Sequence, residues 1–161
     1  MTNTEISKEI YELLIKIARK RGVTVNELIL ECISKNVDPK VKIKIYTKLH
    51  EKYLREAEEL YNKGNIVQAC EKYWGALTTL LSIIAEKEGL PHYSHRDLRD
   101  VIEFLTEKTN DPEYSRLFSS AEALHANFYH GFMGKLSFDV HRNDVIRLIQ
   151  KIKEFMRLEL R

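Results

Sequence analysis

The chain has 161 residues, of which 43% are hydrophobic and 31% are charged, and its formal net charge is +2. This composition excludes a disordered chain and a general polycation, and the length fits one domain with an N-terminal extension. The charge is uneven: residues 1–57 contain 12 Lys and Arg against 8 Asp and Glu, whereas residues 58–161 contain 14 against 16. The basic front is a candidate phosphate-binding surface, although ordinary solvent-exposed helix faces explain the same excess.

The N-terminal segment predicts two short helices. From about Ser7 to Arg21, apolar residues recur at the spacing of one helix face, and they are Ile10, Leu13, Leu14 and Ile17. Gly22 is typical of the residue that follows a helix. Thr24 and Glu27 have the spacing of a capping box, in which each side chain binds the other residue's backbone N–H, so a second helix should begin there. Its expected apolar face is Leu28, Ile29, Cys32 and Ile33.

Two long helices are predicted next, at about residues 38–63 and 66–87. Asp38 followed by Pro39 combines an N-cap carboxylate with a first-turn proline, and Asn65 is a candidate cap for the second helix. The expected apolar face of the first is Val41, Ile45, Leu49, Tyr53, Ala57 and Leu60. The second has a wider apolar face, formed by Ala69, Cys70, Tyr73, Trp74, Leu77, Leu80, Leu81 and Ile84. A helix this apolar should lie at the centre of the fold.

Three more helices are expected after Pro91. Capping signals at Ser94 and at Asp111-Pro112 begin two of them, and the last is predicted over about Asp139 to Leu158. We therefore predict an all-α protein: an antiparallel four-helix bundle over residues 38–161, with space for one helix outside it, and an accessory or dimerising helical pair over residues 1–37.

The cysteines and the hydropathy predict a reducing, aqueous environment. Cys32 and Cys70 fall on apolar helix faces without a CxxC spacing, so we expect reduced core thiols. No apolar run approaches the roughly 20 residues that span a bilayer. Residues 1–8 lack the apolar stretch of a signal peptide. We therefore expect a cytoplasmic protein without membrane association.

The most unusual stretch lies near the end of the predicted sixth helix. At about 100° per residue, Glu122, His125 and Tyr129 share one helix face, whereas Asn127 and His130 share another. The two histidines are about 140° apart on a regular helix, so they converge only if the helix loosens or two subunits meet. An imidazole here could act as a general acid or base beside groups that orient a phosphate. Alternatively, His125 and Tyr129 only bind a neighbouring helix.

A second candidate site is Ser94-His95-Arg96. It lies at a predicted helix N-terminus, where unpaired N–H groups and the helix dipole favour an anion, and His95 and Arg96 add positive charge. Simple capping at the surface is the alternative.

Glu71 and Trp74 lie one helical turn apart, and with Glu122 they are candidates for supporting roles. A buried Glu71 would need a partner, such as His125 or Arg96, although a position at the boundary between core and surface is the alternative. The other two helical histidines, His50 and His141, are expected on exposed faces.

Most enzyme and metal motifs are absent from the sequence. There is no HExxH. His92 and His95 are three residues apart but flank a predicted loop and cap, and the spacing of His125 and His130 does not place both on one helical face, so neither a metal site nor a cofactor is expected. The absence of a Gly-rich phosphate loop, of GxSxG and of paired carboxylates argues against kinases, dehydrogenases and serine hydrolases.

From about Asp38 onward, the chain resembles the archaeal PaREP family (type one). The resemblance lies in Asp38-Pro39, Ala57-Glu-Glu-Leu60, Gly64-Asn65, Gln68-Ala69, Glu71-Lys72, Trp74-Gly75-Ala76, Ser94-His95-Arg96 and the Ala-Glu-Ala-Leu-His-Ala-Asn-Phe-Tyr of residues 121–129. The Trp-Gly-Ala and His-x-Asn-Phe-Tyr stretches are the most specific. That family is similar to the HEPN superfamily, which implies an α-helical bundle and often a dimer.

The HEPN resemblance also implies an activity. Several HEPN proteins are metal-independent ribonucleases or toxins with an Arg-x4–6-His motif near the end of a bundle helix, and others are inert binding partners. His130 matches the motif histidine, but His125 stands where the arginine would be. A histidine is charged only part of the time at neutral pH and lacks the bidentate fork of arginine.

Three functional hypotheses follow. The first is an RNA- or nucleotide-binding bundle that cleaves RNA by acid–base chemistry, with the site residues His95, Arg96, His125, Asn127, Tyr129 and His130. The second is a catalytically inert homo-oligomeric interaction or regulatory module, similar to those of toxin–antitoxin pairs, in which the same side chains hold helices or subunits together. The third is DNA binding by an N-terminal dimer, because the first two helices resemble a ribbon-helix-helix unit. The strand that this unit requires would be Thr2 to Ile6, which has no Lys or Arg.

Overall fold

The computed structural model describes residues 6–159, and all regular structure within this range is helical, which confirms the all-α prediction. The elements are α1 (Lys8–Arg21), α2 (Val25–Ile33), a 3-10 turn (Ser34–Asn36), α3 (Pro39–Asn62), α4 (Ile66–Glu88), α5 (His95–Thr109), α6 (Glu113–His130) and α7 (Lys135–Glu159). Of the strand needed for DNA binding, residues 2–5 lie outside the described range. None of the described helices is long and apolar enough to cross a membrane.

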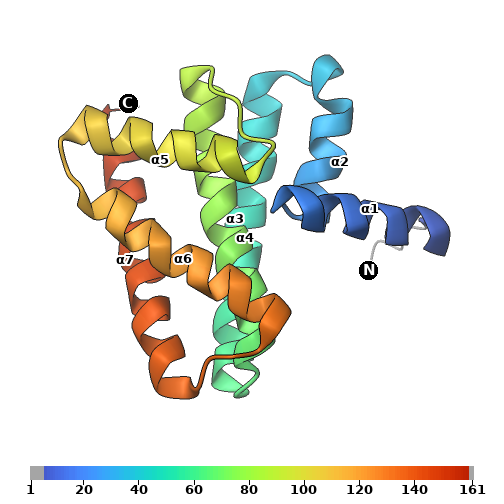
Figure 1. Ribbon diagram of the computed structural model, residues 1–161. Coiled ribbons are helices and arrows are strands. Elements are labelled where there is room, and N and C mark those ends of the chain that lie inside the picture. The colour runs from blue at the N-terminus through green and yellow to red at the C-terminus, as the bar shows by residue number, and fades with distance from the viewer. Residues whose placement is uncertain (1–5, 160–161) are drawn as a thin grey trace.

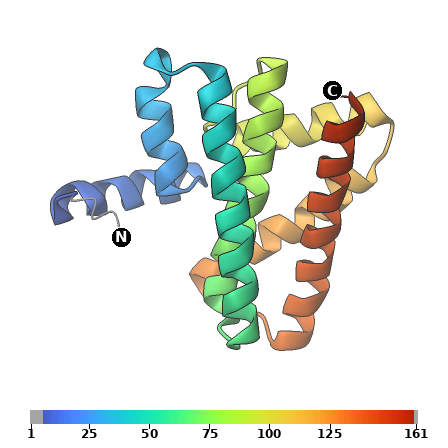
Figure 2. The same ribbon diagram turned by 180° about the vertical axis from the view of Figure 1, so that it is seen from behind.

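Helix α4 lies at the centre of the fold, as its apolar face predicted. All residues from Tyr73 to Ala85 are buried. Figure 1 shows α3 antiparallel to α4, α7 along the other side, α6 crossing obliquely between α7 and α4, and α5 lying across one end. The reverse view in Figure 2 shows the same arrangement. Helix α4 is therefore the element on which most of the others pack.

Helix α7 begins at Lys135, four residues before the predicted start at Asp139. The earlier start lets Phe138, which is fully buried, stack on Tyr61 with ring centroids 5.9 Å apart. One turn further on, the Arg142 guanidinium donates to Tyr73 Oη and to Glu58, both at 2.6 Å. These contacts hold α7 against α3 and α4.

The buried face of α3 differs in part from the predicted one. Tyr53 and Ala57 are buried as predicted, but the rest of the buried face is Lys42, Tyr46 and His50, whereas Val41 and Ile45 are exposed. The expectation that His50 is exposed was therefore wrong: its Nδ1 lies 2.7 Å from the Ala76 carbonyl oxygen in the α3–α4 interface. The cause is that the face was predicted from apolarity alone, whereas a hydrogen-bonded imidazole and two tyrosines pack equally well.

The thiol prediction was half right. Cys70 is buried on α4, but Cys32 is exposed on α2. The buried residues of α2 are Glu27, Leu28 and Leu30, so Cys32 lies outside its buried side. His141 is partly buried and lies 3.0 Å from Ser120 Oγ, so the expectation of an exposed, unengaged residue was wrong for it too.

The N-terminal helices are attached to α3 and α4 mainly at the loop between α1 and α2. Asn26 Nδ2 donates to Tyr53 Oη at 2.7 Å, and Trp74 Nε1 donates to the Gly22 carbonyl at 2.9 Å. Gly75 permits this approach, because a Cβ there would lie 3.1 Å from the Tyr53 ring. The rest of α1 extends away from the bundle (Figures 1 and 2).

Candidate functional site

The indole of Trp74 is the centre of an aromatic cluster where four helices meet. The His125 ring of α6 stacks on it, with centroids 4.4 Å apart and planes at 20°. The His95 ring of α5 and the Phe118 ring of α6 lie at 5.3 and 5.8 Å. The indole N–H binds the Gly22 carbonyl at the end of α1. Trp74 thereby fixes the end of α1 relative to α5 and α6.

His125 is the packing partner in this cluster. Burial, and to a lesser extent the neighbouring His95, lowers its pKa to about 4, and its Nδ1 is buried without a hydrogen-bond partner in the described part of the chain. The imidazole is therefore neutral at pH 7. It supplies no positive charge to a phosphate at that pH.

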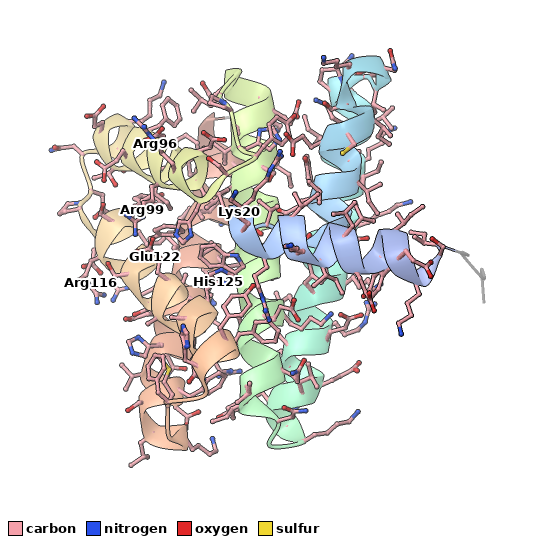
Figure 3. The ribbon with its side chains drawn as sticks, turned by 45° about the vertical axis from the view of Figure 1, so that its right-hand side comes forward. Lys20, Arg96, Arg99, Arg116, Glu122 and His125 are labelled. Atoms are coloured by element: carbon pink, nitrogen blue, oxygen red, sulfur yellow. The ribbon has the colours of Figure 1, made fainter. Side chains whose placement is uncertain are left out.

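A carboxylate joins α5 to α6 beside the cluster. Glu122 Oε1 accepts from His95 Nε2 at 2.8 Å and from Arg99 Nε at 2.6 Å. Figure 3 shows Arg99 above Glu122, with His125 close by. The sequence analysis identified His95 and Glu122 but missed Arg99. Its spacing of one turn from His95, on the same face of α5, was the available signal.

A basic groove lies between the end of α1 and the start of α5. Its volume is about 530 Å³, and its lining residues are Ile17, Lys20 and Arg21 of α1 and Ser94, His95 and Arg96 at α5. Arg21 pairs with Glu31, whereas Lys20 and Arg96 form no ion pair within residues 6–157. Lys20 and Arg96 both carry labels in Figure 3, one on α1 and the other on α5. Two uncompensated cations from distant parts of the chain therefore meet at one groove.

The start of α5 adds to the positive potential of this groove. Ser94 Oγ accepts the N–H of Asp97 at 3.1 Å, which is the predicted N-cap. The N–H groups of His95 and Arg96 have no intrahelical partner by their position in the first turn, and they form the positive end of the helix dipole. The Asp97 carboxylate binds the Tyr93 N–H at 2.9 Å. The groove thus presents N–H donors and two cations to an anion.

The sequence analysis missed Lys20 as a site residue and treated it only as a favourable charge at a helix end. The signal was the basic surplus of the first third of the chain. His95 and Arg96 were predicted, and the structure places both in the groove.

Two predicted site residues lie apart from the groove. Asn127 is fully buried: its Nδ2 donates to Cys70 Sγ at 3.3 Å and its Oδ1 accepts the Met133 N–H at 2.8 Å. It holds the end of α6 and is not available to a ligand. His130 is the exposed last residue of α6, and because the helix is continuous to this point, His125 and His130 do not converge within one chain.

Tyr129 and Glu71 line a separate recess of about 250 Å³ on the other side of α1. The Arg19 guanidinium lies 4.7 Å from the centre of the Tyr129 ring. The charges that act on Glu71 are those of Lys72 and Arg19, rather than those of His125 or Arg96. The anticipated partner of Glu71 was therefore wrong. Within the described residues, no group of three or more His, Cys, Asp or Glu side chains could hold a metal ion.

The fold and these sites define a small helical-bundle protein with a basic groove beside an aromatic cluster. Residues 45–149 match the Archaeal PaREP1/PaREP8 family, which is well over half of the chain. The chain belongs to that family, as the sequence resemblance indicated. Comparisons with curated proteins and with solved structures found no match.

Proposed function

We propose that this protein binds RNA or a nucleotide through phosphate in the groove between α1 and α5. The observation that carries the proposal is the meeting of Lys20 and Arg96, neither paired with a carboxylate, at the first turn of α5. By contrast, Arg99 of α5 and Arg116 of α6 each pair with a carboxylate. A groove that concentrates unpaired positive charge attracts a polyanion.

The geometry supports binding better than cleavage. In the HEPN resemblance, catalysis requires a histidine together with an arginine five to seven residues earlier, which is roughly one and a half to two helical turns away. His125 stands at that second position, but it is half-buried and stacked on Trp74, and its pKa is lowered to about 4. If the bound RNA is cleaved, the exposed His130 is the residue that we assign as general acid or base.

The double variant Lys20→Ala/Arg96→Ala should bind a fluorescein-labelled mixed-sequence RNA at least about tenfold more weakly than the wild type. Each phosphate contact that is lost also reduces the slope of log K against log salt by about 0.7. We therefore expect the slope to fall by roughly 1–1.5 for the two contacts. Fluorescence anisotropy at several salt concentrations, in EDTA, measures both quantities, and a gel of the same samples shows whether the RNA stays intact.

A matched control is available at a second basic groove, between α4 and α7, which is lined by Lys87, Gln150, Lys153, Met156 and Arg157. Lys87→Ala/Lys153→Ala makes the same change in net charge and should leave RNA affinity within about twofold. An equal loss of affinity in both double variants would contradict the assignment to the α1–α5 groove. Cleavage that persists in His130→Ala would remove His130 from any catalytic role.

A second candidate function is self-association through α1. Ile10 and Leu13, one turn apart, are 55% and 56% exposed, so this apolar face is not covered by the rest of the chain. The helix is acidic in its first turn, at Glu9, and basic in its last, at Arg19, Lys20 and Arg21. Antiparallel pairing with the α1 of a second copy would cover the apolar face and bring opposite charges together.

Light scattering after gel filtration tests the dimer. The wild type should have twice the chain mass of 19.0 kDa, and Leu13→Asp should have the mass of one chain, because a buried charge without a partner opposes association. Leu136→Asp is the control, since Leu136 is an 85% exposed apolar residue on α7. A wild type that stays monomeric at high concentration would overturn this candidate.

A further inference from the structure

The carboxylate of Glu71 stands between two adjoining recesses beneath α1. Their volumes are about 250 and 240 Å³, and both are lined by Tyr11, Thr24, Val25 and Glu71. Arg19, Phe128 and Tyr129 line the first recess, together with further residues of α1. Asn26, Tyr53 and Lys72 line the second, together with Lys52 of α3. A ligand in either recess would contact the Glu71 side chain.

Glu71 has no hydrogen-bond or ion-pair partner among the described residues, although its side chain is partly buried. The two nearest cations are engaged elsewhere. Lys72 Nζ lies 2.9 Å from Glu56, and the Arg19 guanidinium lies over the Tyr129 ring. Burial raises the pKa of Glu71, and the charges of Lys72 and Arg19 oppose that rise. A carboxylate in this position is an acceptor that lacks a donor.

Four aromatic side chains contribute to the walls of the two recesses. Tyr11 comes from α1, Tyr53 from α3, and Phe128 and Tyr129 from α6. Tyr11 is 49% exposed, so its ring is open to a ligand. Aromatic side chains of this kind stack on the unpaired bases of single-stranded nucleic acid.

The charges around the recess discriminate between ligands. An ionised carboxylate only accepts hydrogen bonds, so it suits a ligand edge with adjacent N–H donors. Among the bases, guanine presents N1–H beside its N2 amino group, whereas adenine and cytosine each place an acceptor nitrogen beside their amino group. An organic cation would also donate, but Arg19, Lys52 and Lys72 at the rim would repel it. The same three cations suit a phosphate attached to a neutral base.

We propose that the Glu71 recess binds a guanine base, with the Glu71 carboxylate accepting from N1–H and the N2 amino group. The base belongs to a nucleotide or to an RNA strand. Binding of a guanine within an RNA strand rests on the proposed function. Binding of free guanosine monophosphate does not, because it would enter the recess without occupying the α1–α5 groove.

Isothermal titration of the full chain with guanosine and adenosine monophosphates tests the recess. The guanine nucleotide should bind at least about tenfold more tightly, since a good bidentate contact to a base gives roughly 5- to 150-fold discrimination. Glu71→Gln should reduce the preference to below about threefold, because the amide offers only one acceptor oxygen. Glu107→Gln, the same charge change at an exposed position of α5, should keep the full preference.

Labelled oligouridylates with one central guanine or one central adenine distinguish the source of the base. A guanine preference that is lost in Glu71→Gln but kept in Lys20→Ala/Arg96→Ala supports the recess on an RNA strand. If no RNA binds, and the guanine nucleotide binds the wild type and Lys20→Ala/Arg96→Ala equally well, the proposed phosphate groove is wrong and the recess stands. Equal affinity of the wild type for the two nucleotides, with no guanine preference in the oligonucleotides, would overturn the inference.

Discussion

Trp74→Ala should lower the free energy of unfolding by about 3–5 kcal/mol, which is typical of removing a buried aromatic side chain. The indole is 2% exposed and contacts Phe118, His95 and His125, so its removal leaves a cavity where α1, α4, α5 and α6 meet. It also leaves the Gly22 carbonyl without its donor. Urea denaturation followed by far-ultraviolet circular dichroism measures the change without relying on tryptophan fluorescence.

Trp74→Phe separates the two contributions. Phenylalanine keeps much of the apolar contact but cannot donate to Gly22, and an unsatisfied buried acceptor costs about 1–3 kcal/mol. The loss in this variant should therefore be clearly smaller than in Trp74→Ala. A loss below about 1 kcal/mol in Trp74→Ala would contradict the packing of the cluster.

The second large effect is a loss of stability in acid between pH 6.5 and 4. Burial lowers the pKa of His125 to about 4, and it also lowers the pKa values of His50 and His92. In the unfolded chain all three titrate near the ordinary value of about 6.5. Below pH 6.5 the unfolded chain therefore binds more protons than the folded one. The contribution of these histidines to the free energy of unfolding is fully present above pH 6.5 and is lost as the pH falls toward their pKa values in the folded state.

For His125, a difference of about 2.5 pKa units corresponds to about 3 kcal/mol, and partial solvent access reduces this to about 2–3 kcal/mol. His125→Phe keeps a ring on Trp74 but does not titrate. Between pH 6.5 and 4, the free energy of unfolding of the wild type should therefore fall by about 2–3 kcal/mol more than that of His125→Phe. Identical pH profiles of the two proteins, from urea titrations at each pH, would show that folding does not lower the pKa of His125.

The two most specific stretches of the family resemblance, residues 74–76 and 125–129, lie against each other in the structure. Trp74 and Gly75 of α4 pack against His125 of α6 and Tyr53 of α3, and Asn127 of α6 binds Cys70 of α4. These residues fix where α1 and α6 lie on α4. The basic groove and the Glu71 recess flank the same α1, so the cluster positions both proposed binding sites.

The sequence determined the helices, because their signals are local. The Thr24–Glu27 capping box, the Ser94 N-cap and the wide apolar face of α4 each depend on residues within a few positions, and the structure confirms all three. Composition likewise indicated an all-α chain. Only the start of α7 was misplaced, because the burial of Phe138 depends on Tyr61, which is distant in the chain.

The tertiary structure decided which faces are covered and which side chains meet. It placed His50 in the buried face of α3 and used the polar groups of Asn127 within the fold. It also brought Lys20 to Arg96 and left Glu71 without a partner between two recesses. Helical spacing gives the direction of a side chain about its own axis, but the partner it meets depends on how separate helices pack.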